Sequence, residues 1–120
     1  MSTVLVVDDS PVIRLMVSAA LGQIDLAVSQ AGCGAEALAI CGNGPIAAVL
    51  LDMELPGENG LEICHALKRD PRTAAIPVIL MSGHAPDELE PGPNLQLPDY
   101  FLAKPFSIDQ IQSVIRQAMA

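Results

Sequence analysis

Five short apolar runs, each rich in valine, isoleucine or leucine, alternate along the chain with longer mixed segments. The runs are almost continuously apolar and do not alternate with polar residues, which is typical of strands that are buried on both faces. The pattern therefore predicts five strands, at Val4–Val7, Leu26–Val28, Ile46–Leu51, Val78–Met81 and Tyr100–Ala103.

The segment after the first run predicts an amphipathic helix. Its apolar residues follow an i, i+3, i+4, i+7, i+8 spacing, which places them on one face of a helix. Ser10 stands where an N-cap is expected and Pro11 at the first helical position. The apolar face consists of Ile13, Met16, Val17, Ala20 and Leu21.

Three further helices are expected between and after the remaining runs. One begins near Ala35 and turns Leu38 and Cys41 toward the core, and another begins at Gly60. The last begins at Ser107, which forms a capping-box pair with Gln110.

Strands that alternate with helices over this length imply right-handed crossovers and a parallel sheet covered on both faces. We therefore assign residues 1–120 to one α/β domain, since a chain of 120 residues suffices for one core. The connection from Ser82 to Tyr100 breaks the pattern, because a proline inside a helix costs about 3 kcal/mol. With Pro91 and Pro93 in this segment, we expect a fourth helix that is short or degenerate.

Composition and charge narrow the function. Apolar residues make up 51 % of the chain and charged residues 17 %, so disorder is not expected. Six basic residues against 14 acidic ones give a net charge of −8, which argues against direct binding to nucleic acid or to anionic lipid. The same acidity favours a multivalent cation and basic protein partners.

The sequence gives no sign of a membrane segment or of a disulfide framework. The longest apolar stretch, Ile46–Leu51, is far shorter than the roughly 20 residues of a membrane span. The amino terminus lacks the basic and apolar regions of a signal peptide, so we expect a cytoplasmic protein. The cysteines are odd in number and have no paired short spacing, which disfavours a disulfide or zinc site.

Polar and charged residues follow four of the five predicted strands. Asp8 and Asp9 follow the first strand, Asp52 the third, Ser82 the fourth and Lys104 the fifth. Ligands of open parallel sheets bind outside the carboxyl ends of the strands, so these groups should meet in one crevice. Three carboxylates in one place oppose each other's ionisation. A hard divalent cation such as Mg²⁺, together with the lysine, would compensate them.

Each of these residues also has an ordinary structural interpretation. An Asp-Asp pair before a helix often serves as a cap and a solvated turn, a serine after a strand often lies in a turn, and a lone lysine is often surface charge. Their joint occurrence at four strand ends of one short chain is what favours the functional interpretation.

Four motifs surround these residues in the chain. They are Val6-Val7-Asp8-Asp9-Ser10, Leu51-Asp52-Met53 with Leu55-Pro56 and Asn59-Gly60, Ile79-Leu80-Met81-Ser82-Gly83, and Lys104-Pro105-Phe106. With these motifs the chain resembles the receiver domain of two-component response regulators over essentially its whole length. The resemblance implies a doubly wound, five-stranded parallel sheet in the order 2-1-3-4-5, flanked by helices.

The resemblance also implies a role for each residue of the crevice. Asp52 would accept a phosphoryl group from a phosphohistidine on a sensor histidine kinase or a phosphotransfer protein. Asp9, Asp52 and the backbone carbonyl of Glu54 would ligate Mg²⁺, which Mn²⁺ could replace, with Asp8 assisting directly or through water. Lys104 would pair with one phosphoryl oxygen. Such a domain catalyses its own phosphorylation and dephosphorylation without being a turnover enzyme.

The remaining implied roles concern the hydroxyl, one peptide bond and the switch. The Ser82 hydroxyl would donate to a second phosphoryl oxygen, and the peptide bond before Pro105 is expected to be cis. In the family, an aromatic residue three positions before the lysine turns inward after phosphorylation. That residue is Phe101 here, preceded by Tyr100. The alternative is that Phe101 simply packs in the core.

Two residues flank the expected path of the attacking water in the family. Glu54 lies two positions after the acceptor, and His84 lies two positions after Ser82. The two side chains could pair and modulate hydrolysis of the aspartyl phosphate, or they could be surface residues. His84 is the site group whose ordinary pKa lies nearest neutrality.

Three functions remain open on the sequence alone. The first is a phosphoacceptor switch that signals by binding a downstream protein. The second is a phosphorelay intermediate or phosphate sink without an output of its own, or a receiver cut from a larger protein such as a hybrid kinase. The third is an unrelated magnesium-dependent phosphatase of similar topology, which would hydrolyse added phosphoesters with turnover.

Overall fold

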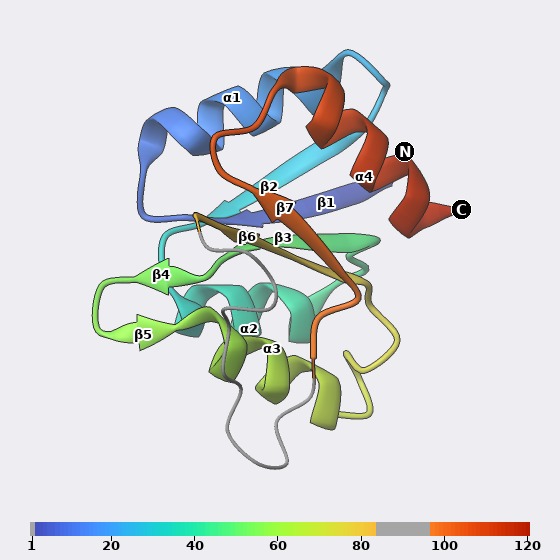
Figure 1. Cartoon of the computed structure of the whole chain (residues 1–120). Coiled ribbons are helices and arrows are strands. Elements are labelled where there is room, and N and C mark those ends of the chain that lie inside the picture. The colour runs from blue at the N-terminus through green and yellow to red at the C-terminus, as the bar shows by residue number, and fades with distance from the viewer. Residues whose placement is uncertain (1, 84–96) are drawn as a thin grey trace.

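The computed structural model of the chain describes residues 2–83 and 97–120. At its centre lies a five-stranded sheet in the order β2-β1-β3-β6-β7, and all of its strand pairs are parallel (Figure 1). Because β6 and β7 are the fourth and fifth strands of this sheet, the order is the expected 2-1-3-4-5. The strands are β1 Thr3–Val7, β2 Ala27–Ala31, β3 Ala48–Asp52, β6 Val78–Ser82 and β7 Tyr100–Ala103.

Four described helices cover the two faces of the sheet (Figure 1). Helices α1 (Pro11–Gly22) and α4 (Ile108–Met119) lie on one face, and α2 (Gly34–Asn43) and α3 (Gly60–Arg69) lie on the other. The doubly wound α/β architecture expected from the sequence is therefore confirmed.

Each face of the sheet has its own apolar core. In β1, Leu5 and Val7 pack toward α2 and α3, whereas Val4 and Val6 pack toward α1 and α4. All four side chains are fully buried. Burial on both faces explains why the strands read as continuous apolar runs.

The helix starts follow the predicted capping chemistry. The Ser10 hydroxyl accepts the Ile13 N–H at 3.3 Å, at the start of α1. At the start of α4, Ser107 Oγ accepts the Gln110 N–H at 3.1 Å, and Gln110 Oε1 accepts the Ser107 N–H at 2.8 Å. The capping box is therefore confirmed.

Strands β2 and β3 differ from the prediction by more than a single end residue, and one helical position also differs from it. Strand β2 extends to Ala31, because an edge strand is defined by its backbone pairing to β1 and tolerates the polar Ser29 and Gln30. Strand β3 begins at Ala48 and includes Asp52. Leu38 does not face the core, as its side chain is 40 % exposed and α2 buries Ala37 instead.

A small hairpin that the sequence pattern did not predict follows β3. It consists of β4 (Glu54–Leu55) and β5 (Glu58–Asn59), and Gly57 in its turn has φ of +71°. Two-residue strands carry no apolar run, so only the Pro56-Gly57 pair signals the turn.

The expected degenerate fourth helix falls largely on residues 84–96, which lie outside the described residues, as does His84. Within residues 2–83 and 97–120, no helix is long and apolar enough to cross a membrane.

Candidate functional site

The carboxyl ends of the central strands bring three carboxylates together. Asp8 follows β1, Asp9 is the next residue, and Asp52 ends β3. One oxygen atom of each carboxylate lies within 4.8 Å of the other two. Asp8 and Asp52 are 1 % and 4 % exposed, whereas Asp9 is open to solvent. Two carboxylates of the cluster are thus buried, and the third is accessible from solvent.

Lys104 lies across the two buried carboxylates. Its Nζ is 3.1 Å from Oδ1 of Asp52 and 3.3 Å from Oδ2 of Asp8. The lysine follows β7 directly, and the Lys104 N–H donates to the Ser82 carbonyl at 2.8 Å. The Lys104–Pro105 peptide bond is cis. The ammonium group is therefore held at the mouth of the same crevice as the carboxylates.

The charges of this cluster perturb one another. Burial raises the pKa of Asp52, and the nearby charge of Asp8 adds to this, although the Glu54 N–H and Lys104 act in the opposite direction. Burial alone would lower the pKa of Lys104, but its contacts with Asp52 and Asp8 outweigh this effect and raise it. The cluster thus contains one ammonium group and three carboxyl groups, which leaves an excess of negative charge.

Asp8 is fixed from two sides. Its Oδ1 accepts the Ser10 N–H at 2.9 Å, and its backbone carbonyl accepts a hydrogen bond from Arg14 Nη1 at 2.6 Å. Arg14 Nε also donates to Gln30 Oε1 on β2 at 3.1 Å. Arg14 was not among the predicted site residues, and its only signal in the sequence was a basic residue directly after Ile13 of the apolar face.

Gly60 lets the first turn of α3 approach the acceptor strand. A Cβ at this position would lie 2.5 Å from the Asp52 carbonyl oxygen and 2.8 Å from Met53 Cα, closer than real Cβ contacts. The Gly60 N–H donates to the Met53 carbonyl at 2.8 Å. The glycine therefore allows α3 to pack closely against the backbone after Asp52. In the sequence, Gly60 stood out only as part of a motif, without a role.

Two further predicted residues, Ser82 and Glu54, lie at the strand ends beside this cluster. Ser82 ends β6 and is 3 % exposed, and it stands one position after Met81, the register partner of Asp52. The Glu54 N–H donates to Oδ1 of Asp52 at 3.2 Å, and the Glu54 side chain is exposed. Both residues therefore lie at the same edge of the sheet as the carboxylates.

The two aromatic residues of β7 differ in their surroundings. Phe101 is 37 % exposed and belongs to neither core, so the alternative that it is an ordinary core residue is wrong. Tyr100 packs against the core beneath α1 and α4, and its hydroxyl donates to the Gln117 carbonyl at 3.4 Å.

The oxygen-rich cluster fits a hard divalent cation. Asp8, Asp9 and Asp52 offer only oxygen donors, and Lys104 offsets just one of their charges. Mg²⁺ prefers one or two carboxylates and keeps several water ligands, which the exposed side of Asp9 would admit.

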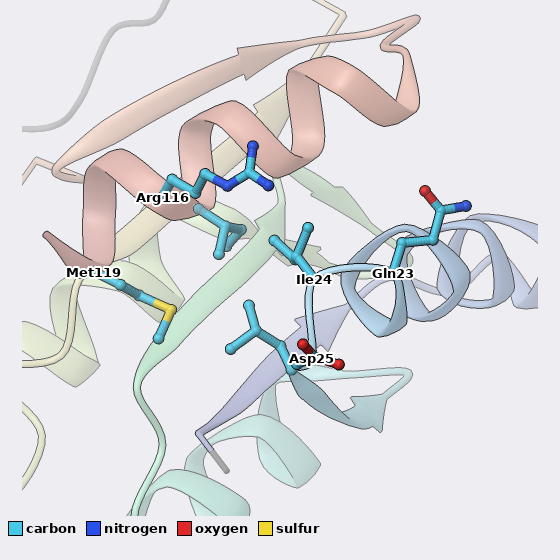
Figure 2. A pocket seen from close by; sticks show the side chains of 7 residues that line it. Gln23, Ile24, Asp25, Arg116 and Met119 are labelled. Atoms are coloured by element: carbon cyan, nitrogen blue, oxygen red, sulfur yellow. The ribbon is translucent and has the colours of Figure 1, made fainter.

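A cavity of about 510 Å³ lies away from this cluster, at the amino ends of the strands. Figure 2 shows Gln23, Ile24 and Asp25 lining it from the turn after α1, with Arg116 and Met119 from α4. It holds one acidic and one basic side chain, and it offers none of the site residues described above.

Comparison with known proteins decides the family. A family model described as the response regulator receiver domain matches residues 4–116. The chain belongs to this family. Receiver domains act in two-component signalling, where histidine kinases or phosphotransfer proteins phosphorylate them. The identification made from the sequence motifs is therefore confirmed.

Individual receiver proteins support the assignment. The DNA-binding dual master transcriptional regulator RpaA of Synechocystis is 33 % identical over 97 % of this chain, which covers 48 % of that protein. The chemotaxis response regulator CheY4 of Vibrio cholerae superposes with a TM-score of 0.90 at 27 % identity, covering 98 % of both chains. TrrA of Thermotoga maritima, solved in complex with Mg²⁺ and BeF, gives 0.85 at 26 % identity and covers 98 % of this chain and 99 % of that one.

The chain spans about half the length or less of the first curated relatives that it matches. Some of these relatives are transcriptional regulators. The expectation that this receiver has no nucleic-acid partner therefore stays a prediction that rests on its acidic charge.

Proposed function

We propose that this receiver domain is a phosphoacceptor switch in which Asp52 takes a phosphoryl group from a phosphohistidine of a sensor kinase or phosphotransfer protein. The P–N bond of the phosphohistidine breaks as an Asp52 carboxylate oxygen forms the new P–O bond, and the imidazole leaves. The observation that carries the proposal is the contact of one lysine with two buried carboxylates beside an exposed third one.

The chain's own residues prepare Asp52 for this reaction. The Glu54 N–H and the Lys104 ammonium both donate to Oδ1 of Asp52, which leaves Oδ2 for the incoming phosphorus. An ionised carboxylate needs no further deprotonation to act as a nucleophile. The burial of Asp52 keeps its carboxylate poorly solvated, which strengthens its interactions with nearby charges.

The proposed metal ligands are Asp9, Asp52 and the Glu54 carbonyl, with Asp8 acting directly or through water. A bound Mg²⁺ would neutralise part of the charge on the phosphoryl oxygens. The complex of TrrA with Mg²⁺ and BeF supports the assignment by similarity. Mn²⁺ would serve the same oxygen ligands.

Lys104 and Ser82 would bind the transferred group. The ammonium would exchange its contact with Asp52 for a phosphoryl oxygen, and the Ser82 hydroxyl would donate to a second oxygen. As Ser82 moves toward the phosphoryl group, Phe101 would turn inward, away from its exposed position. Such a shift requires that the phosphoryl group contact the two conformations differently. The downstream partner would read this change as a new protein surface.

Intact-mass analysis of the chain after incubation with phosphorylated candidate kinases tests the proposal. We expect a Mg²⁺-dependent gain of one phosphoryl group, which is abolished in Asp52→Asn and retained in the control Asp109→Asn, since Asp109 lies exposed on α4. Phosphorylation that survives in Asp52→Asn, or that is indifferent to EDTA, contradicts the proposed chemistry. Onward transfer to a second histidine protein would identify a relay intermediate.

A further inference from the structure

A groove of about 340 Å³ runs between α2, α3 and the β4–β5 hairpin. It lies on the face of the sheet that carries α2 and α3 (Figure 1). Its lining comprises Gly34, Ala35, Leu38, Gly57, Glu58, Asn59, Glu62, Ile63 and Ala66.

The middle of the groove is apolar. Leu38 contributes a side chain that is 40 % exposed, although it lies on a helix that packs against the sheet. Ile63 and Ala66 of α3 line the groove with it. The exposed apolar surface of Leu38 is unfavourably hydrated. An apolar side chain bound against it would bury this surface and so gain free energy of binding.

The rim of the groove is acidic. Its charged lining residues are Glu58 and Glu62. All six basic residues of the chain are among the described residues, and none of them lines the groove; they are Arg14, Lys68, Arg69, Arg72, Lys104 and Arg116. The undescribed residues 84–96 contain no lysine or arginine either.

The shape of the groove is fixed by a close contact across it. Oε2 of Glu58 accepts the Gly34 N–H at 3.0 Å, which joins the hairpin to the start of α2. A Cβ on Gly34 would lie 2.5 Å from Glu58 Oε1 and 2.9 Å from Ile63 Cδ1. The contact between Glu58 and Gly34 is already present without a ligand. Binding would therefore not have to order the groove, and such preorganisation lowers the free-energy cost of binding.

We propose that this α2–α3 groove docks a basic amphipathic helix of another protein, with an apolar side chain of leucine size against Leu38 and lysines or arginines beside Glu58 and Glu62. Apolar anchors at helical spacing in a groove are a common mode of peptide recognition. The charge of the rim selects this partner over a second copy of the chain, because two acidic rims would repel. The cavity in Figure 2 carries both Asp25 and Arg116 and selects neither sign of charge.

Chemical-shift mapping with a defined peptide tests the proposal. The ¹⁵N-labelled chain is titrated with a synthetic peptide of about 16 residues, long enough to form a helix. The peptide carries leucines at i, i+3, i+4 and i+7 and lysines elsewhere. A second peptide has glutamate in place of every lysine. We expect amide shifts at residues 34–38 and 57–66 with the lysine peptide and none there with the glutamate peptide.

Matched variants distinguish docking in the groove from nonspecific binding of the peptide. Leu38→Lys should weaken binding about tenfold, whereas Leu15→Lys, at a 69 % exposed leucine of α1, should change it less than about twofold. Glu62→Gln should weaken binding about two- to threefold, and Asp109→Asn should not, although both residues are exposed acids in the first turn of a helix.

Three results would overturn the proposal. These are shifts centred on α1, an equal loss of affinity in Leu15→Lys and Leu38→Lys, or equal binding of the glutamate peptide. Thermal melts of each variant show whether it is folded, and Glu62→Gln tests the groove without altering its apolar surface. None of these measurements needs phosphorylation of the chain. A failure of the docking proposal can therefore be told apart from a failure of the proposed phosphoacceptor chemistry.

Discussion

Replacing Asp52 by asparagine should stabilise the metal-free domain. The substitution removes one charge from the acidic cluster but keeps a side-chain oxygen that can accept from the Glu54 N–H and from Lys104. It therefore isolates the charge of Asp52 from its shape and its hydrogen bonds.

The distances at the site give the expected magnitude. At an effective dielectric constant of about 20, two carboxylates whose oxygens lie within 4.8 Å of each other repel by at least about 3.5 kcal/mol. The ion pair of Lys104 with Asp52 at 3.1 Å attracts by about 5 kcal/mol on the same scale. Asp52 faces two carboxylates, one of them exposed and partly screened, and its burial opposes its charge. We expect a net gain of about 1–2 kcal/mol in Asp52→Asn, or roughly 4–8 °C in Tm.

Thermal melts followed by circular dichroism, in EDTA and then in Mg²⁺, measure this difference. In EDTA the variant should melt at a higher temperature than the wild type. Adding Mg²⁺ should raise the melting temperature of the wild type much more than that of the variant. Asp109→Asn is the charge-matched control and should stay within about 0.5 kcal/mol of the wild type under both conditions.

The pH dependence supplies a second readout with a defined sign. Because the folded state raises the pKa of Asp52, it binds this proton more tightly than the unfolded chain does. The wild type should therefore lose stability relative to Asp52→Asn as the pH rises through that raised pKa, and the two melting temperatures should converge in acid. Equal melting in EDTA at neutral pH would refute the crowding of charge, and equal stabilisation by Mg²⁺ would refute Asp52 as a ligand.

Three other predictions use the same structure. Lys104→Met should lower the free energy of unfolding of the metal-free chain by about 2–3 kcal/mol in urea titrations, opposite in sign to the change at Asp52, because it leaves buried carboxylates unpaired. Gly60→Ala should destabilise by about 1–3 kcal/mol in the same assay, while Gly22→Ala, with open space around it, should not destabilise. The buried thiols of Cys41 and Cys64, whose pKa burial raises to about 11, should react with a thiol reagent at pH 7.5 only after urea unfolds the chain.

The sequence predicted the sheet and the site for the same physical reason. Strands buried on both faces must be apolar throughout, so the residues that end them stand out, and a parallel sheet gathers these ends at one edge. Asp52 and Lys104 were therefore recognisable although 52 residues separate them along the chain.

What the pattern missed depends on backbone geometry. Strand β2 lies at the edge of the described sheet and is held by its pairing to β1, so Ser29 and Gln30 could belong to it without an apolar run. Arg14 acts on a carbonyl group, which no side-chain pattern reveals. Gly60 acts by lacking a Cβ. The need for glycine at this position follows from the structure, in which the Asp52 carbonyl lies beside it.

The hydrogen bond from the Lys104 N–H to the Ser82 carbonyl continues the pairing of β6 and β7 one step beyond Ala103. It joins the residue that carries the ammonium to the residue that carries the hydroxyl through main-chain atoms alone. Neither residue can be displaced along its strand without straining the other, so a substitution that shifts one of these strand ends should move both the ammonium and the hydroxyl together.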